Sequence, residues 1–429
     1  MQSIRRHFAL LNTILLLLSI PAYGDNWPQF RGPTGLGYTS EKNLPLTWGG
    51  ASNENLLWTS PLKGQGHASP IVWGDSVFVC TVKWPTPEQR ADVMPEHHVT
   101  CYAAADGAVK WDRLIEPGPW LRSDFRSGPG GGYAAPTPTT DGTLVYCAFG
   151  SAVLAALDFQ GNIVWRKQLV PFTFDVTLGS SPILYHDSLL LLCAMAKPAD
   201  SCVIAFNKAT GEEKWRRKFP TMAFGHSTPV IIDVNGRTQM LLLASGMSVK
   251  DDALRSLDPA DGKELWTCRA AGDAASPAYG AGIVYCDSGR GSPGFAIDPT
   301  GTGDVSKTHT RWTVNQLPEA ISSPIILGQY LYRLNSSSVL RCFEAATGKQ
   351  IYAERLRGLS SDWASPIADA NGRLYFANAG KSYVIQTGPQ FRILATNDLG
   401  DGNHPSPAVA NGRFFLVGMK NIYCVGQKP

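Results

Sequence analysis

The stretch ISSPIILGQYLYRLNSSSVLRCFEAATGKQIYAERL, residues 321–356, decides the fold, because its pattern recurs along the chain. A small residue and a proline precede an apolar run, a glycine and two further apolar runs. A tight turn containing glycine and a last run with an aromatic residue follow. Short apolar runs rich in β-branched and aromatic residues, separated by turn formers, are typical of β-strands. Each unit therefore predicts four short antiparallel strands.

Pairs of a small residue and a proline mark eight such units. Successive prolines lie 66, 46, 47, 48, 47, 42 and 41 residues apart, and the irregular first interval contains an insertion at residues 83–98. A period near 45 residues is typical of the blades of a β-propeller. The pairs are Ser69-Pro70, Ala135-Pro136, Ser181-Pro182, Thr228-Pro229, Ser276-Pro277, Ser323-Pro324, Ser365-Pro366 and Ser406-Pro407.

The eighth unit, SPAVANGRFFLVGMKNIYCVG, contains only three strands. The missing fourth strand matches NLLWTSPL, residues 55–62. We expect this segment to complete the last blade, because a closed ring leaves no exposed sheet edge. The sequence thus predicts an all-β, eight-bladed β-propeller of four-stranded antiparallel blades over residues 55–429. Residues 25–54 are expected to form an N-terminal extension on the outside or on one face of the ring.

An aromatic residue recurs in the last strand of most units. In five units it follows the turn glycine by four positions, and a tryptophan stands in the N-terminal strand. We expect each ring to pack against the next blade, since a tryptophan can bury ~150–250 Å². Ligand stacking is the alternative. These structural aromatics are Trp58, Trp111, Trp165, Trp215, Trp266 and Tyr352.

Residues 1–24 predict a cleaved signal peptide. Arg5 and Arg6 precede an apolar stretch at residues 8–20, and small residues stand at the cleavage positions within residues 22–24. The apolar stretch is shorter than the ~20 residues that a membrane span needs, and an uncleaved anchor is the alternative. We therefore expect a periplasmic or secreted protein without a transmembrane segment after signal cleavage.

Bulk composition excludes some classes of function. A formal net charge of +3 over 429 residues gives no electrostatic argument for a nucleic-acid partner. The nine cysteines form no CxxC motif and no adjacent pair, and most stand in strand-like runs where they serve as small buried hydrophobes. Cys193 with Cys202, or Cys80 with Cys101, could face each other across a hairpin. Whether a disulfide forms in an oxidising compartment is left open.

The units resemble the pyrroloquinoline-quinone (PQQ) type repeat, with its small-Pro pair and its final ALD…G…W pattern, over about residues 55–429. The stretches WPQFRGPTGLGYTSEKNLPLTW, residues 27–48, and GYAAPTPTTDGTLVYCAFGSAVLAALDFQGNIVWRKQL are similar to secreted superfamily members of planctomycete-type bacteria. The same blade type builds the outer-membrane barrel-assembly lipoprotein, a scaffold, and the quinoprotein alcohol dehydrogenases. The resemblance implies the fold and leaves the function open between these classes.

The family's dehydrogenases hold PQQ and Ca²⁺ in the central funnel, between an adjacent-cysteine disulfide and a tryptophan, with an aspartate as base. This sequence has no adjacent cysteines and no clustered carboxylates and amides of the kind that ligate Ca²⁺. Its densest acidic spot, Asp251-Asp252, is interpreted as a solvated turn. We therefore expect no cofactor, with PQQ and calcium as the alternative. GxSxG, HExxH and P-loop motifs are also absent from the sequence.

Pseudo-symmetry predicts which side chains meet at the mouth of the central funnel. The residue two positions before each small-Pro pair occupies an equivalent place in every blade. In blades 7, 8, 1 and 2, which are neighbours in a closed ring, these residues are Trp363, His404, His67 and Tyr133. We expect this arc to bind a ligand by stacking and hydrogen bonding; ordinary rim residues are the alternative. Two histidines without a carboxylate do not predict a metal site.

The loop PGPWLRSDFRSGPGGGY, residues 117–133, leads into this arc. Arg122 and Arg126 flank Asp124 in it, and arginines with aromatics on a rim loop favour a protein, peptide or anionic ligand. The alternative is that Asp124 pairs with an arginine and holds the loop down.

Together these features predict an extracytoplasmic, non-catalytic binding or scaffold protein that takes a protein, peptide or small-molecule ligand at one propeller face. A PQQ-dependent alcohol or sugar dehydrogenase and a polysaccharide-binding accessory protein are the alternatives.

Overall fold

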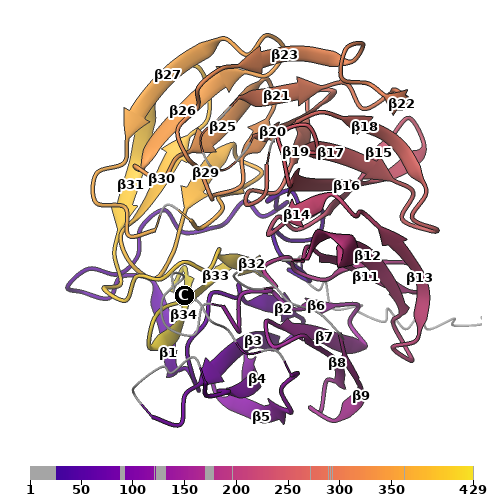
Figure 1. The fold of residues 1–429 in the computed structure, drawn as a ribbon. Helices are drawn as coiled ribbons and strands as arrows, with labels where there is room; N and C mark the ends of the chain where they lie inside the picture. The colour runs from indigo at the N-terminus through magenta and orange to yellow at the C-terminus, as the bar shows by residue number, and fades with distance from the viewer. Residues whose placement is uncertain are drawn as a thin grey trace, which may run out of the picture.

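The computed structural model describes residues 26–86, 92–119, 121, 132–169, 178–195, 197–270, 272–287, 289, 291, 293–361 and 363–428. Eight sheets surround a central axis like the blades of a fan (Figure 1). Within the described ranges there is no α-helix, and only one short 3-10 helix, η1 (Pro198–Asp200), is present. None of these residues forms a helix long and apolar enough to cross a bilayer. The predicted eight-bladed, all-β propeller is confirmed.

Each blade is an antiparallel sheet whose strands follow one another from the channel outward. Blades 1 to 3 consist of β2 (Ile71–Trp73), β3 (Ser76–Lys83), β4 (Glu96–Ala103) and β5 (Val109–Ile115); β6 (Thr139–Thr140), β7 (Leu144–Phe149), β8 (Val153–Asp158) and β9 (Ile163–Gln168); and β10 (Ile183–Tyr185), β11 (Ser188–Cys193), β12 (Cys202–Asn207) and β13 (Glu213–Lys218). Blades 4 and 5 consist of β15 (Val230–Val234), β16 (Arg237–Gly246), β17 (Ala253–Leu257) and β18 (Glu264–Cys268); and β19 (Ala278–Gly280), β20 (Ile283–Asp287), β21 (Gly294–Ile297) and β23 (Thr310–Val314). Blades 6 and 7 consist of β24 (Ile325–Leu327), β25 (Tyr330–Leu334), β26 (Val339–Glu344) and β27 (Gln350–Arg355); and β28 (Ile367–Ala368), β29 (Arg373–Phe376), β30 (Ser382–Gln386) and β31 (Arg392–Asn397).

Blade 8 joins the two ends of the propeller. Its inner strands are β32 (Ala408–Ala410), β33 (Arg413–Val417) and β34 (Asn421–Gly426). The outer strand β1 (Leu56–Pro61) pairs antiparallel with β34, and Trp58 lies opposite Cys424. The predicted closure of the last blade by an N-terminal strand is therefore confirmed.

Blade 4 departs from the repeat. An additional strand, β14 (Met222–Phe224), pairs with the far end of β16, at Ser245 and Gly246. A second addition, β22 (Gly303–Asp304), pairs in parallel with β18. The β14 pairing extends one wall of blade 4 beyond its neighbours at the channel end.

A closed ring of hydrogen bonds between neighbouring blades surrounds the channel. The small residue of each small-Pro pair is a serine or threonine whose hydroxyl accepts the backbone N–H of its counterpart one blade earlier, over 2.9–3.1 Å. The last bond, from Ser406 N–H to Ser69 Oγ, closes the circle at 3.0 Å. We call these residues the hydroxyl ring: Ser69, Thr137, Ser181, Thr228, Ser276, Ser323, Ser365 and Ser406.

The ring corrects one predicted anchor. The sequence AAPTP contains two small-Pro pairs, and the structure uses Thr137-Pro138, not Ala135-Pro136. Only a residue with a hydroxyl can accept the Ser69 N–H at this place, which alanine cannot do. Every position deduced for blade 2 from the earlier anchor is therefore two residues too early.

We expect Ser323→Ala to lower the free energy of unfolding by about 1–3 kcal/mol, because the buried N–H of Ser276 loses its acceptor. Ser323→Thr is the matched control, because threonine already fills two ring positions. Urea unfolding of the three proteins measures the difference. Equal midpoints for the alanine and threonine variants would show that the ring adds no stability.

Outside the channel, tryptophans on the outer strands join the blades. The ring of Trp111 lies against Gly161 of the next blade, and its indole N–H donates to the Phe159 carbonyl at 2.8 Å. Gly161 has φ 82°, and a Cβ there would lie 2.7 Å from the Trp111 ring, so glycine is needed for both reasons. Trp58, Trp165, Trp215 and Trp312 lie in the same way over Gly107, Gly211, Gly262 and Gly348.

Two of the predicted structural aromatics do not pack over a glycine of the next blade, and one aromatic that does so was not predicted. Trp266 is fully buried and donates its indole N–H to Gln239 Oε1 at 2.7 Å. Tyr352 packs edge-on against Phe391. Trp312 takes the blade-5 position, and it escaped the pattern because the β22 segment separates it from the turn glycine.

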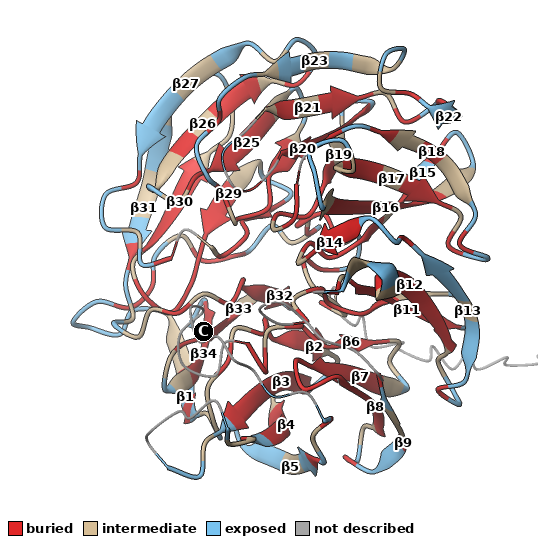
Figure 2. Cartoon of the chain, in the orientation of Figure 1, coloured by how far each residue is buried: buried red, intermediate tan, exposed pale blue. Residues whose placement is uncertain are grey.

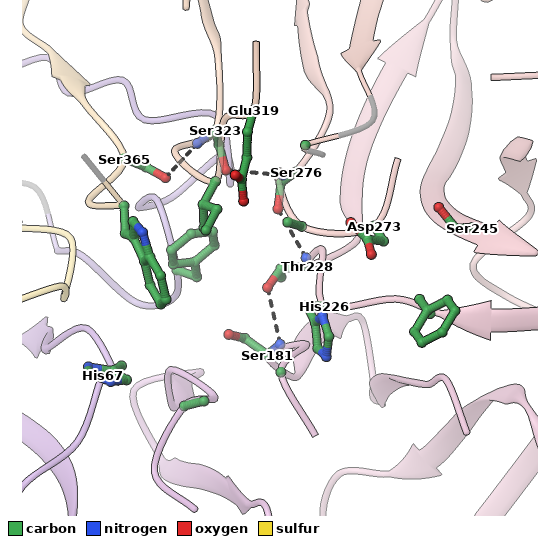
Figure 3. Close-up of a pocket in the computed structure, with 18 of the residues that line it drawn as sticks. His67, Ser181, His226, Thr228, Ser245, Asp273, Ser276, Glu319, Ser323 and Ser365 are labelled. Atoms are coloured by element: carbon green, nitrogen blue, oxygen red, sulfur yellow. Dashed lines mark hydrogen bonds between the residues drawn. The ribbon is translucent and has the colours of Figure 1, made fainter. Parts of the chain in front are cut away.

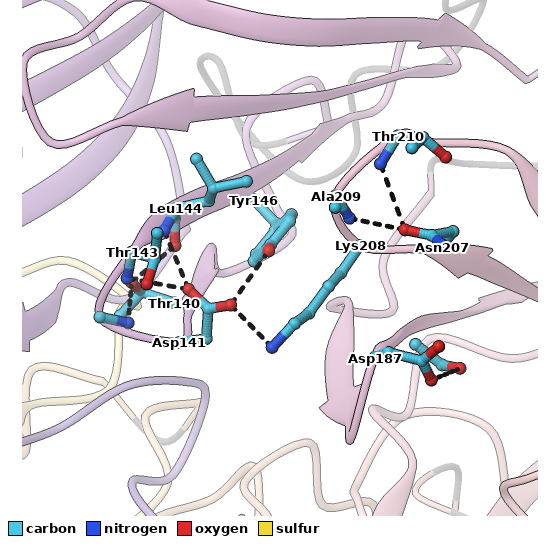
Figure 4. Close-up of polar contacts among 12 residues, drawn as sticks. Thr140, Asp141, Thr143, Leu144, Tyr146, Asp187, Asn207, Lys208, Ala209 and Thr210 are labelled. Carbon is cyan, nitrogen blue, oxygen red and sulfur yellow. Dashed lines mark hydrogen bonds and ion pairs between the residues drawn. The ribbon is translucent and has the colours of Figure 1, made fainter.

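Ion pairs also cross between blades. Lys208 of blade 3 reaches Asp141 of blade 2 at 2.8 Å, and Asp141 also accepts the backbone N–H of Leu144 (Figure 4). Deeper inside, Arg333 of blade 6 contacts Asp287 of blade 5 through two nitrogens, at 2.6 and 3.3 Å. The Arg333 and Asp287 side chains are each 1% exposed. Their separation would leave an isolated buried charge.

Arg333→Met should therefore lower the free energy of unfolding by about 3–5 kcal/mol. Adding Asp287→Asn should restore part of this loss, since the buried charge is removed. The control is Lys83→Met, which breaks a largely exposed pair with Glu96 (3.9 Å) and should cost less than about 1 kcal/mol. Urea unfolding of each variant provides the comparison, and equal effects of Arg333→Met and Lys83→Met would contradict the assignment.

The N-terminal extension covers one face of the propeller, as the indigo segment crossing the middle of the ring indicates (Figure 1). It pairs with Val72 in blade 1, and further on with Ala368 in blade 7. Each of these contact residues lies three positions after a member of the hydroxyl ring, so the extension lies beyond that ring along the channel. Arg31, which is 2% exposed, donates from one Nη2 to the Leu36 and Pro324 carbonyls.

Burial follows the radial order of the strands (Figure 2). The second and third strands of most blades are buried along most of their length, whereas outer strands such as β5 and β27 carry exposed residues. The apolar core therefore lies between blades, and the channel itself is lined by the residues at the start of the innermost strands.

Candidate functional site

The channel contains a cavity of about 940 Å³. Phe30 of the N-terminal extension lines it, so we assign that face as its floor. All eight members of the hydroxyl ring line its wall. The residues two positions before each ring member also line it, and they mark the opposite end, which we call the mouth. These mouth residues are His67, Ala135, Gly179, His226, Ala274, Ile321, Trp363 and His404.

Three of the mouth residues form a cluster that spans blades 7, 8 and 1. The Trp363 and His404 rings stack, with centroids 4.4 Å apart and an interplanar angle of 24°. His67 meets His404 edge-on at 5.0 Å and lies 6.4 Å from Trp363. The structure thus brings together three of the four residues of the predicted arc.

Tyr133 does not belong to this arc. Its side chain is fully buried, and its ring packs 5.8 Å from Trp84 and 5.7 Å from His97. The corrected anchor places Ala135 at the mouth of blade 2. The other loop residues predicted for the site, Arg122 and Arg126, lie outside the described residues, as does the predicted signal peptide.

Hydrogen bonds fix the orientation of His404. Ser361 Oγ lies 3.0 Å from His404 Nδ1 and accepts the backbone N–H groups of Trp363 and Ala364. Since the Ser361 oxygen already accepts two bonds, its own O–H donates to His404 Nδ1. The imidazole is then the tautomer with hydrogen on Nε2, which leaves a donor at the mouth. Ser361 is itself buried and is not among the residues that line the cavity, so its hydroxyl positions His404.

Asn403 connects the two histidine loops. Its side-chain nitrogen donates to the carbonyls of Gly66, at 3.2 Å, and Gly418, at 2.9 Å. Its side-chain oxygen accepts the His404 N–H at 2.8 Å. Because Gly66 directly precedes His67, one buried amide sets the relative position of both imidazoles.

Burial and the neighbouring His67 lower the pKa of His404 to about 4. An unfolded histidine titrates near pH 6.5, so the unfolded chain binds the proton more readily. Stability from His404 is therefore present above about pH 6.5 and is lost as the pH falls toward 4. NMR of the imidazole C–H signals should show His404 titrating near pH 4.

Burial also lowers the pKa of His97 to about 4, so acid unfolding alone does not isolate His404. Between pH 6.5 and pH 4.5, the free energy of unfolding should fall less for His404→Gln than for the parent. The difference between the two decreases is the contribution of His404. A His404 signal that titrates near its ordinary value would contradict a desolvated, neutral imidazole.

The opposite wall of the cavity, from blade 4 to blade 6, is acidic. Asp252, Asp273 and Glu319 line it, and no lysine or arginine does so among the described lining residues. Burial, together with the charges of Asp273 and Asp251, raises the pKa of Asp252. Figure 3 shows Glu319 and Asp273 on this side and His67 across the cavity. The carboxylates thus lie on one side of the mouth, together with His226 of blade 4, and the cluster of Trp363, His404 and His67 lies on the other.

An apolar lip adjoins the acidic half. Phe224 of β14, with Met247 and Val249 of the loop after β16, lines the cavity. Met247 and Val249 are each 70% exposed. Exposed apolar side chains beside a cavity are a signal for a binding surface. The position of the lip follows from the β14 extension of blade 4.

These residues correct one prediction and add others. Asp252, interpreted from the sequence as part of a solvated turn, lines the cavity and accepts the Gly246 N–H at 2.9 Å. The lip was also missed. Its signal in the sequence is the presence of methionine and valine in the polar loop GMSVKDD.

The described cavity lining shows neither a cationic side chain for the carboxylates of PQQ nor a converging metal site for calcium. PQQ carries three carboxylates, and no lysine or arginine among the described lining residues is placed to pair with them. No group of three or more histidine, cysteine, aspartate or glutamate side chains converges as a metal site within the described chain. All nine cysteines are buried, and none lines the cavity. We therefore derive no chemistry through a quinone.

A known family model matches most of the repeat region. A family model described as outer membrane protein assembly factor BamB matches residues 95–250 and again residues 247–412. The chain belongs to this BamB-type family of PQQ-like repeat propellers. No curated protein matches the sequence of this BamB-type propeller.

Solved structures of two functional kinds share the fold of this BamB-type propeller. BamB from Moraxella catarrhalis is 14% identical, with a TM-score of 0.61 over 87% of this chain and 97% of that one. A europium-containing methanol dehydrogenase is 11% identical, with a TM-score of 0.66 over 92% of this chain and 90% of that one. At such identities the likeness concerns the fold alone, and function depends on the site.

Proposed function

We propose that this BamB-type propeller is an extracytoplasmic, non-catalytic binding protein that captures a basic peptide segment of a partner at the channel mouth. The observation that carries the proposal is the division of one cavity into a Trp363 and histidine half and a carboxylate half. A lysine or arginine of the ligand pairs with Asp273 or Glu319, and an adjacent planar or aliphatic group packs on Trp363.

The apolar lip favours a peptide over a sugar. Met247 and Val249 are adaptable aliphatic side chains, which suit varied peptide side chains. Trp363 is the one tryptophan among the described residues that line the cavity. Neither feature provides the row of aromatic platforms that an extended polysaccharide would stack on. The polysaccharide-binding alternative therefore has less support from the site.

The binding interpretation also has more support than the dehydrogenase alternative. Ser361, whose hydroxyl meets His404, is buried and does not line the cavity. The described lining offers no lysine or arginine for the carboxylates of the quinone, and the description of the matching family model names an assembly factor. Export to the periplasm rests on the N-terminal sequence and belongs to the proposal.

Calorimetry with a capped peptide of alternating lysine and leucine, containing one phenylalanine, tests the proposal. We expect the full-length protein to bind it, and the same peptide with glutamate in place of lysine to bind much more weakly. Trp363→Ala should weaken binding about tenfold or more, since stacking and cation–π contacts contribute ~1–2 kcal/mol. The double variant His67→Ala with His404→Ala should weaken it without a large change in melting temperature.

The matched control is His186→Asn, which changes an exposed histidine outside this cavity and keeps a residue type that tolerates its φ of 51°. It should bind like the parent. Equal binding of the lysine and glutamate peptides, or unchanged binding by Trp363→Ala, would refute the proposal. Tight stoichiometric binding of PQQ with Ca²⁺ would instead support the dehydrogenase, and binding of oligosaccharides alone would support the polysaccharide alternative.

A further inference from the structure

Two cysteines lie directly opposite each other in blade 3. Cys193 ends β11 and Cys202 begins β12, and the two residues are register partners. The connection between them contains η1, and its Ser201 side chain accepts the Met195 N–H at 2.8 Å. Both cysteines are fully buried. The predicted meeting of Cys193 and Cys202 across a hairpin is thus what the structure shows.

The spacing of an antiparallel pair suits a disulfide. Opposed residues have Cα atoms about 4.5 Å apart in a non-hydrogen-bonded pair and about 5.5 Å apart in a hydrogen-bonded one. Both values lie within the ~4.4–6.8 Å that a disulfide spans. Joining the two sulfur atoms therefore needs side-chain rotation and little movement of the backbone.

Arg216 makes the two cysteines chemically unequal. Its Nη1 lies 3.8 Å from Cys202 Sγ, and Glu213 holds the same guanidinium through bonds of 3.0 and 2.6 Å. A cation beside a sulfur favours the thiolate, which is the form that attacks a disulfide. The Cys193 thiol and Arg216 both hold the pKa of Cys202 below its ordinary value, against the effect of burial.

We propose that Cys193 and Cys202 form a disulfide that closes the base of the 194–201 loop, with Cys202 as the attacking group. The oxidant is an external disulfide such as that of glutathione, which reaches Cys202 while blade 3 is partly open, because both thiols are buried in the closed blade. The Cys202 thiolate attacks one of its sulfur atoms, which releases one thiolate and forms a mixed disulfide. Cys193 then loses its proton to solvent and attacks Cys202 Sγ, which releases the second thiolate. Two thiols are oxidised and one external disulfide is reduced.

Other cysteine pairs lack this geometry. Cys80 lies opposite Val99, and Cys101 lies opposite Phe78, so the second predicted pair does not face each other. Cys80 also approaches Cys147, but these residues belong to β3 and β7 of adjacent blades. Sheets packed face to face lie about 10 Å apart, beyond the ~7 Å limit between Cα atoms. The disulfide is therefore expected at one place.

The location links the disulfide to the lip. η1 contacts β14, which carries Phe224. A covalent link at the base of the η1 loop restrains the segment that supports β14. The inference does not depend on the proposed ligand, since it concerns the chemistry of two thiols.

The test is peptide mapping without reduction after the full-length protein has been refolded from urea in the presence of glutathione disulfide, which gives the reagent access to both thiols. We expect a cross-linked peptide containing Cys193 and Cys202, and seven free thiols of the nine after unfolding. Nine free thiols, or a cross-link between Cys80 and Cys147, would overturn the proposal. Arg216→Gln should slow the oxidation several-fold at pH 7, and less at a pH where the thiol ionises unaided.

Variants distinguish a specific link from general oxidation. Cys202→Ser should keep all remaining thiols free, and Cys193→Ser should stop at a mixed disulfide with glutathione on Cys202. The matched control, Cys147→Ser, should still form the Cys193–Cys202 link. The oxidised parent should also unfold at a higher urea concentration than the reduced parent, and loss of that difference in Cys202→Ser excludes an effect of glutathione elsewhere. Failure of this test leaves the peptide-binding experiment unaffected, because that experiment depends on the mouth residues and not on these two thiols.

Discussion

The hydroxyl ring is the constraint on which the rest of the structure depends. Each member is at once a donor through its N–H and an acceptor through its side chain, so the bonds form a closed circle that includes the first and last blades. A serine or threonine is short enough to keep neighbouring innermost strands close, and the proline after it contributes no further N–H to satisfy. The circle thereby fixes both the width of the channel and the height at which every blade begins.

That common height divides the channel into two levels. Three residues after two of the ring positions, Ser69 and Ser365, the N-terminal extension adds its own backbone pairing, at Val72 and at Ala368, and it places Phe30 in the floor. Two residues before the ring, the side chains are free of the repeat and differ from blade to blade. The two ends of the channel therefore differ: the extension contributes Phe30 at the floor, and the side chains at the mouth vary from blade to blade. The repeated residues form the blades and the hydroxyl ring, and the residues just before each ring position determine which chemical groups face the cavity.

The propeller architecture could be predicted from the sequence because its units repeat at a regular spacing. The eight units, the four strands of each and the closure by residues 55–62 all follow from spacing, and all are confirmed. Errors arose where the period was ambiguous or interrupted. The sequence AAPTP contains two small-Pro pairs, and only the need for a hydroxyl selects Thr137 as the ring residue. Tyr133, predicted at the mouth from the other pair, is therefore buried elsewhere. The packing role of Trp312 was missed because the β22 segment separates it from the turn glycine. The place of Asp252 at the mouth was missed because its loop is positioned by the pairing of β14 with β16.

The mouth of the channel is asymmetric, and this asymmetry is the feature of the site that bears most directly on function. Eight equivalent positions could carry eight similar side chains, yet Trp363, His404 and His67 gather on blades 7, 8 and 1, whereas the carboxylates, His226 and the apolar lip lie on blades 4 to 6. Buried contacts maintain this division: Asn403 and Ser361 orient His404 on one side, and β14 supports the lip on the other. Ordinary rim residues would not need a fixed tautomer or a dedicated strand. The ordering of both halves around one cavity therefore favours selection for a ligand with two chemically different ends, over a channel that is merely left open at the centre of a ring.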